Sequence, residues 1–188
     1  MQQGDRDDIV RLTTEYGGQW GLMHTRRLLH LISLIGEGLA YDQDIVWIAA
    51  YLHDWGAYAP WAQPGVDHVV RSTQVAQTYL AEKGYPDDVI QRVIDCIATH
   101  HRGEPDRSVE AILLSDADAL DFLGAVGILR DFSKNPREMR KAHRSVVDRM
   151  QKVPRLICLD RAREIAAGRL QVMDEFLREF ETETDGCY

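Results

Sequence analysis

Apolar residues recur at helical spacing along almost the whole chain. One stretch places His24, Leu28, Leu31 and Ile35 at intervals of three and four, which puts them on one face of a helix. No stretch alternates apolar and polar residues between turn signals, as a half-buried strand would. The pattern therefore predicts an all-α fold, a bundle of about seven helices. The expected helices cover residues 21–37, 44–54, 66–83, 86–101, 108–132, 136–152 and 156–182.

Turn-forming residues support these divisions. Pro86 and Pro136 stand where new helices are expected to start, a position that favours proline because the amide it lacks would have no helical partner. At 188 residues the chain suffices for one well-buried domain, and no low-complexity linker divides it. We therefore expect a single domain over residues 1–188.

Two side chains capable of binding a metal, those of His53 and Asp54, close the apolar run at 45–52. Burying an unpaired carboxylate is strongly unfavourable, so Asp54 should meet a cation, a dense set of hydrogen bonds, or solvent. A metal ion would serve both residues at once.

The balance of acidic and basic residues indicates which classes of partner the protein can bind. The chain has 30 acidic and 22 basic residues, a formal net charge of -8, and its hydrophobic fraction of 45% is ordinary for a soluble globular protein. Binding to a nucleic acid or an anionic membrane needs clustered Lys and Arg, so neither partner is expected. A local basic pocket remains compatible with this balance.

The cysteine pattern and the N-terminus indicate a compartment. Cys96, Cys158 and Cys187 are widely spaced and form no C-x-x-C motif, which favours neither a disulfide framework nor a thiolate zinc site. The first eight residues are polar and acidic, unlike a signal peptide, and no apolar run is long enough to span a membrane. We expect a cytoplasmic protein with reduced thiols.

Polar residues that we expect to face inward form an ordered series. They are His24, His53-Asp54, His68, His100-His101, and Asp116, Asp118 and Asp121. Their local motifs are H-x-x-R at 24–27, apolar-L-H-D-x-G at 49–56, and D-A-D-x-L-D-x-x-G-x-x-G-x-x-R at 116–130. Together they resemble the HD-domain superfamily of metal-dependent phosphohydrolases over residues 20–132. Residues 133–188 carry no motif and are expected to form a helical extension.

The resemblance implies a divalent metal held by His24, His53, Asp54 and Asp118. Asp118 fits the family's A-D-x-L motif better than Asp116, which remains an alternative. Mixed imidazole and carboxylate ligands favour Mn, Fe, Co, Ni or Zn over Ca. The additional histidines leave open whether one ion or two are bound.

The implied activity is hydrolysis of a phosphoester or phosphoanhydride in a small molecule, foremost a nucleotide, by a metal-activated water. Asp54, Asp121 and His101 are the expected catalytic groups, acting on the water or on the leaving oxygen. Substrate phosphate is expected to bind a set of basic residues. These are Arg27, Arg130, His68 and His100, with Arg71, Arg102 and Lys134 as further candidates.

Other functions are compatible with the same residues. A minority of HD-fold proteins are di-iron oxygenases, and a non-catalytic nucleotide-binding regulatory module is a third possibility. The amphipathic segment 165–180 leaves both intramolecular packing and a homodimer contact open.

Overall fold

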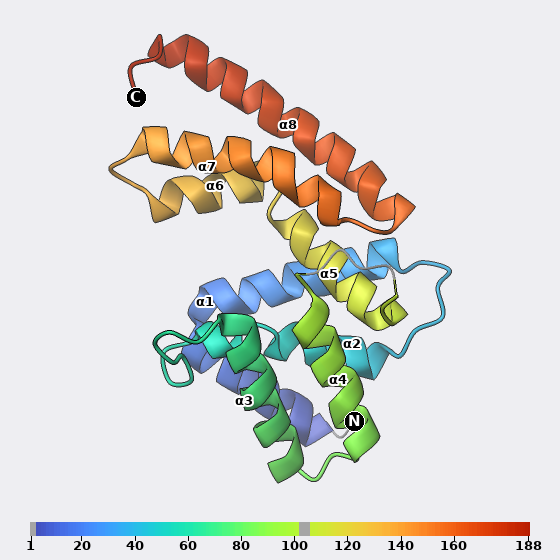
Figure 1. Ribbon diagram of the computed structural model, residues 1–188. Helices are drawn as coiled ribbons and strands as arrows, with labels where there is room; N and C mark the ends of the chain where they lie inside the picture. Colours follow the sequence, from blue (N-terminus) through green and yellow to red (C-terminus); the bar gives the residue numbers. More distant parts are fainter. Residues whose placement is uncertain (1–2, 102–105) are drawn as a thin grey trace. The chain divides into compact units, whose positions relative to one another are not determined.

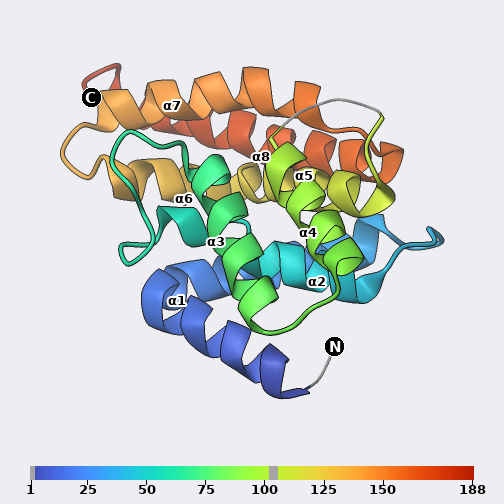
Figure 2. The same cartoon turned by 60° about the horizontal axis from the view of Figure 1, so that its bottom comes forward.

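A computed structural model describes residues 3–101 and 106–188, which contain eight α-helices and two short 3-10 helices (Figures 1 and 2). No strand occurs in these described residues, so the predicted all-α fold is confirmed. The elements are α1 (Gln3–Ile35), α2 (Gln43–Leu52), η1 (Trp55–Ala57), α3 (His68–Glu82), α4 (Asp87–Thr99), α5 (Val109–Asp121), α6 (Gly124–Lys134), α7 (Met139–Lys152), η2 (Val153–Leu156) and α8 (Asp160–Thr184).

The first helix begins earlier than predicted. α1 starts at Gln3 and kinks at Gly18, whose φ of 61° lies in the left-handed region. Before the kink only Ile9 and Thr13 are buried, so the apolar periodicity there is too weak to predict a helix. Polar contacts attach this part instead: Asp8 binds the Lys83 ammonium at 2.7 Å.

The prediction of one helix over residues 108–132 was wrong. The structure has two helices, α5 and α6, separated after Asp121. Gly124 opens α6 with a φ of 73°, a conformation that other residues rarely adopt. The helical periodicity continues through the break, which is why the pattern alone did not reveal it.

The chain divides into two compact units, residues 1–115 and 116–188, with the boundary inside α5. In the first unit, α2 packs against α1 and α4, and α3 packs against α4 and η1. In the second unit, α6 packs against both α7 and α8. Fully buried side chains fill each unit, including Leu28, Leu52 and Ile97 in the first and Val146 and Met173 in the second. The single-domain expectation stays a prediction.

In the described part of the chain, no helix combines the length and the apolar character needed to cross a membrane. The three cysteines are unbridged: Cys96 is buried, Cys158 is partly buried and Cys187 is exposed.

Candidate metal centre

Two of the predicted histidines end helices and are held in the same way. His53 is the C-cap of α2 and His100 the C-cap of α4. The Nδ1 atom of His53 lies 2.9 Å from the carbonyl oxygen of Ala50, and Nδ1 of His100 lies 2.6 Å from that of Ile97. A carbonyl oxygen can only accept, so each Nδ1 carries a proton and the lone pair of the neutral ring is on Nε2. A neutral imidazole oriented in this way is suited to bind a metal through Nε2.

His24, His53 and Asp54 bring three potential ligand atoms together. Nε2 of His24 lies 3.3 Å from Nε2 of His53. Oδ2 of Asp54 lies 3.7 Å from the first nitrogen and 3.5 Å from the second. Ligands about 2.1 Å from a tetrahedral ion are about 3.4 Å from one another. The three atoms therefore have the spacing expected of ligands to one ion, and the 29% exposure of the Asp54 side chain gives access from solvent.

The turn that presents Asp54 depends on Gly56. A Cβ atom at Gly56 would lie 2.3 Å from the backbone nitrogen of Ser72 and 2.5 Å from the carbonyl oxygen of His68, both in α3. Glycine permits this close approach, and its N–H donates to the Ser72 hydroxyl at 2.8 Å. The neighbouring Trp55 is fully buried. Asp54 is thus fixed by the residues that follow it, which explains the glycine of the H-D-x-G motif.

Tyr58 was not among the expected site residues. Its side chain lies against α1: a Cβ atom at Gly17 would lie 2.5 Å from a ring carbon, and one at Gly21 would lie 2.5 Å from the hydroxyl oxygen. Its hydroxyl is buried and has no hydrogen-bond partner among the described residues. Burial, with a smaller effect of the Asp54 carboxylate, raises the pKa of Tyr58, so the hydroxyl remains protonated. The sequence signal for this contact is the pair Gly17 and Gly21, which are spaced about one helical turn apart.

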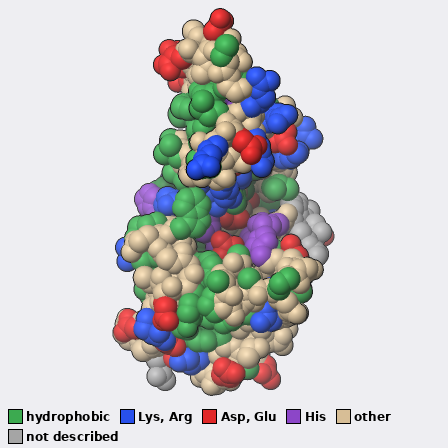
Figure 3. All heavy atoms as spheres, turned by 90° about the vertical axis from the view of Figure 1, so that its left-hand side faces the viewer, with side chains coloured by type: hydrophobic (Ala, Val, Ile, Leu, Met, Phe, Trp, Pro, Cys, Tyr) green, Lys and Arg blue, Asp and Glu red, His purple; other side chains and the backbone are tan. Residues whose placement is uncertain are grey.

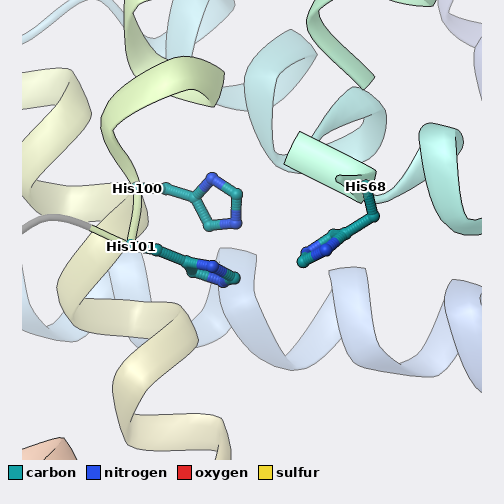
Figure 4. Close-up of side chains that lie close together, drawn as sticks. All are labelled: His68, His100 and His101. Carbon is teal, nitrogen blue, oxygen red and sulfur yellow. The ribbon is translucent and has the colours of Figure 1, made fainter. Parts of the chain in front are cut away.

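A second group of histidines adjoins the first. His68, His100 and His101 each offer a nitrogen, and these nitrogens lie within 4.8 Å of one another. Figure 4 shows the three rings directed toward one another from α3 and from the end of α4. His100 is also next to His53, with ring centroids 5.2 Å apart. Five histidines and Asp54 therefore form one cluster within the first unit, and both one-ion and two-ion occupancy fit it.

The two candidates for the last ligand differ in their surroundings. The Asp116 carboxylate accepts hydrogen bonds from the backbone N–H of Cys158, at 3.0 and 3.1 Å, and of Leu159, at 2.7 Å. Asp116 therefore holds the backbone of the two residues that precede α8. Asp118 is buried two residues further along α5. This difference favours Asp118, whose role as a ligand stays a prediction.

Asp121 and Arg130, predicted as a proton donor and a phosphate ligand, are bound to each other. Nη1 of Arg130 donates to Oδ2 of Asp121 at 2.9 Å, and both side chains are buried. The Arg130 guanidinium also lies over the Phe122 ring, 4.2 Å from its centroid. In the structure the two charges therefore neutralise each other. The roles of Asp121 as a proton donor and of Arg130 as a phosphate ligand stay predictions.

The remaining predicted phosphate ligands have varied environments. Arg27 is half-buried on α1, three residues after His24. Arg71 donates from Nε to the carbonyl oxygen of Trp61 at 2.6 Å, so part of its guanidinium holds the loop after η1. Lys134 is exposed at the end of α6, and Arg102 lies outside the described residues.

The family model of the HD domain matches residues 21–123. The chain belongs to the HD domain family. The matched range contains the histidine cluster, Asp54 and the three aspartates of α5, and it ends before α6.

Curated relatives of this HD domain include ribonuclease Y proteins. The protein of that name from Desulforamulus reducens is 30% identical over 144 residues, which cover 77% of this chain and 24% of the relative. That from Oceanobacillus iheyensis is 32% identical over 111 residues, or 59% of this chain and 19% of the relative. The chain thus spans about a quarter or less of the length of these relatives.

Solved structures share the fold over nearly the whole chain. Bacillus subtilis YpgQ in complex with ADP has 25% identity and a TM-score of 0.74, covering 94% of this chain and 93% of that one. An HD superfamily hydrolase from an uncultured Thermotogales bacterium has 28% identity and a TM-score of 0.66, covering 94% and 89%. HD domains bind divalent metals, and the clustered His and Asp side chains described above are groups that could hold one.

Proposed function

We propose that this protein is a metal-dependent phosphohydrolase that cleaves a phosphoester or phosphoanhydride of a small molecule, foremost a nucleotide. The observation that carries the proposal is the triangle of ligand atoms from His24, His53 and Asp54, with edges of 3.3 to 3.7 Å. The likeness to YpgQ, whose structure contains ADP, supports a nucleotide as substrate. The likeness to ribonuclease Y adds RNA phosphodiesters to the substrates worth testing.

We infer that His24, His53, Asp54 and Asp118 hold the ion. The first three have suitable spacing, and the assignment of Asp118 rests on the family motif at 117–120 and on the structural use of Asp116. Mn, Fe, Co, Ni and Zn all suit imidazole and carboxylate ligands. A divalent ion bound there supplies Lewis acidity to a water molecule and to a phosphoryl oxygen.

The protein's own side chains account for proton transfer in this proposal. A carboxylate has two oxygens, so Asp54 can orient the attacking water and accept its proton with one of them. His101 is exposed and, when protonated, can donate to the leaving oxygen. Asp121 is the second candidate for that role, and it would first have to separate from Arg130.

Substrate phosphate needs positive charge in a chain with a net charge of -8. Arg27 is the proposed phosphate ligand nearest in sequence to His24. His68 and His100 would hydrogen-bond to the phosphate if one ion is bound, and would bind the second ion if there are two. Arg130 would contribute only after release from Asp121.

A second candidate is a di-iron oxygenase. It is favoured specifically by the His68, His100 and His101 group beside His53, which offers the nitrogen ligands that a second ion needs. A regulatory module that binds a nucleotide without hydrolysing it remains the third candidate.

Metal reconstitution separates these functions. Metal-stripped protein is loaded with Mn, Fe, Co, Ni, Zn or Mg, and phosphate and pyrophosphate release is followed from nucleoside mono-, di- and triphosphates and a short RNA. Turnover with a divalent metal supports the hydrolase. Oxygen consumption by protein holding two irons supports the oxygenase, and nucleotide binding without turnover supports the module; either result without phosphate release would overturn the hydrolase proposal.

A further inference from the structure

Charge is distributed unevenly along the chain. Residues 134–155 hold eight basic and two acidic residues, although the whole chain has a net charge of -8. Figure 3 shows Lys and Arg side chains gathered over the unit formed by α6, α7 and α8. The overall acidic balance, which argued against a nucleic-acid partner, therefore conceals one strongly basic segment.

Apart from Arg149, the Lys and Arg residues of α7 and Arg137 in the turn before it lie on the exposed side of the helix. Arg137, Lys141 and Arg144 follow at intervals of four and three, Asp148 and Lys152 continue at intervals of four, and Arg140 lies beside Lys141, so these residues share one side of the helix. The opposite face is apolar, with Ala142 and Val146 buried in the second unit. We call this row the basic stripe; it consists of Arg137, Arg140, Lys141, Arg144 and Lys152.

Most of the stripe is not neutralised by the protein. Lys152 pairs with Asp148 at 2.9 Å. Arg137, Lys141 and Arg144 form no ion pair with any acidic side chain of residues 3–101 and 106–188. Their charges therefore face solvent and are available to a partner.

Arg149 differs from the stripe although it belongs to the same helix. Its Nε and Nη2 donate to the two carboxylate oxygens of Asp131 at 2.7 and 2.8 Å, and its guanidinium lies over the Phe122 ring. This arginine stabilises the packing of α7 on α6. The fold thus uses Arg149 internally. Within the stripe, Arg140 donates to the carbonyl oxygen of Tyr188 at 2.7 Å and Lys152 pairs with Asp148, and the other three residues face solvent.

The chemistry of the exposed face distinguishes between polyanionic partners. A helix that binds a membrane surface exposes apolar side chains beside its basic residues. α7 buries Ala142 and Val146 and exposes Met139 at its first position, and the rest of its exposed face offers guanidinium and ammonium groups along a helix of 14 residues, or about 21 Å. Phosphates of one strand in a duplex recur about every 3.4 Å, so this length matches about six of them.

We propose that the basic stripe of α7 binds the phosphate backbone of a nucleic acid. Binding occurs through Arg and Lys contacts to phosphate, which makes it independent of base sequence and strongly dependent on salt. The stripe shares no residue with the histidine cluster, and the proposed binding requires no metal.

The test compares two double charge reversals in the full chain. Lys141→Glu/Arg144→Glu alters the stripe, and Arg163→Glu/Arg178→Glu makes the same change in net charge on α8, where both arginines are exposed in ion pairs. Binding of a fluorescent 20-nucleotide RNA is measured by anisotropy in EDTA at 50 to 200 mM salt. We expect the stripe variant to bind about tenfold more weakly at 50 mM salt, with a salt slope about 1.4 smaller, and the control to change by less than about twofold.

Several outcomes would overturn the proposal. These are an equal loss in both variants, no salt-dependent RNA binding by the unaltered protein, and tighter binding to phosphatidylserine vesicles or polyglutamate than to RNA. The stripe variant should still hydrolyse small nucleotides if the proposed function holds. Loss of RNA binding with retained nucleotide hydrolysis therefore separates the two proposals.

Discussion

Buried ionisable groups behave differently in the two units. In the second unit, Asp116 binds backbone N–H groups, Asp121 binds Arg130 and Asp131 binds Arg149, while a fourth buried aspartate, Asp118, is the proposed metal ligand. In the first unit, the buried His24 and His53 bring their Nε2 atoms within 3.3 Å of each other and close to the Asp54 carboxylate.

This difference separates buried polar groups that stabilise the fold from buried polar groups that are suited to bind a ligand. A buried carboxylate that is fully hydrogen-bonded or ion-paired contributes to stability, and removing its partner is costly. In the first unit, Nδ1 of His53 is bound to the Ala50 carbonyl oxygen and Nε2 of His53 lies close to Nε2 of His24 and to the Asp54 carboxylate, an arrangement that suits a metal ion. Each of the following predictions tests one side of this contrast.

The largest effect is expected for His53→Ala. Removing one ligand should lower divalent-metal retention and phosphate release by at least about 100-fold, because even supporting residues of metal sites change affinity by 10–100-fold. Metal content by mass spectrometry and phosphate release measure this, with helicity checked by circular dichroism. His30→Ala, an exposed histidine on the same helix as His24, is the matched control. Full metal content in the His53 variant would remove the basis of the site.

Asp131→Ala should destabilise the protein without removing the metal. Arg149 would lose both carboxylate bonds in a largely buried position, and breaking a buried ion pair costs about 3–5 kcal/mol. Urea unfolding gives the free energy. Asp148→Ala removes an exposed carboxylate that pairs with Lys152 and should change stability by less than about 1 kcal/mol. Equal effects of the two changes would contradict the structural role of Asp131.

Asp116→Asn and Asp118→Asn should have opposite signatures. The first loses a charged acceptor for the N–H groups of Cys158 and Leu159, so it should lower the free energy of unfolding by about 1–3 kcal/mol and retain metal. The second should reduce metal content. Urea unfolding and metal analysis of both variants decide between them, and metal loss in the Asp116 variant would reverse the assignment.

The smallest effect is expected for Asp8, a carboxylate near the surface whose partners, like that of Asp131, are basic side chains. Lys83 and then Arg11 lower the pKa of Asp8 from 3.8 to about 2. A lowered pKa in the folded state gives stability that is present above pH 3.8 and is lost as the pH falls toward 2. Asp8→Asn should therefore be about 1 kcal/mol less stable than the unaltered protein at pH 5, after allowance for solvent screening.

Urea unfolding of both proteins between pH 5 and pH 2 measures this difference. The gap should narrow as Asp8 becomes protonated, because both proteins then carry a neutral side chain at this position. A gap that stays constant over the range would show that Asp8 does not titrate as proposed.

Local patterns in the sequence predicted the fold class and the family. Spacing of apolar residues indicated helices, and the motifs around His24, His53 and Asp118 indicated the HD domain, which the family match confirms. The predicted helix boundaries were wrong in two places where the spacing of apolar residues carries no information. The first half of α1 is held by polar contacts such as Asp8 with Lys83, and the break before α6 depends on the backbone of Gly124.

The sequence by itself determined that this chain is helical and which ionisable residues are available for chemistry. Only the tertiary structure decided how those residues are used. It fixed the proton of His53 on Nδ1, brought Cys158 and Leu159 to Asp116 from 42 and 43 residues away, and left the basic stripe of α7 exposed. The physical reason is that periodicity is a property of neighbouring residues, whereas hydrogen-bond partners and burial depend on segments distant in the chain.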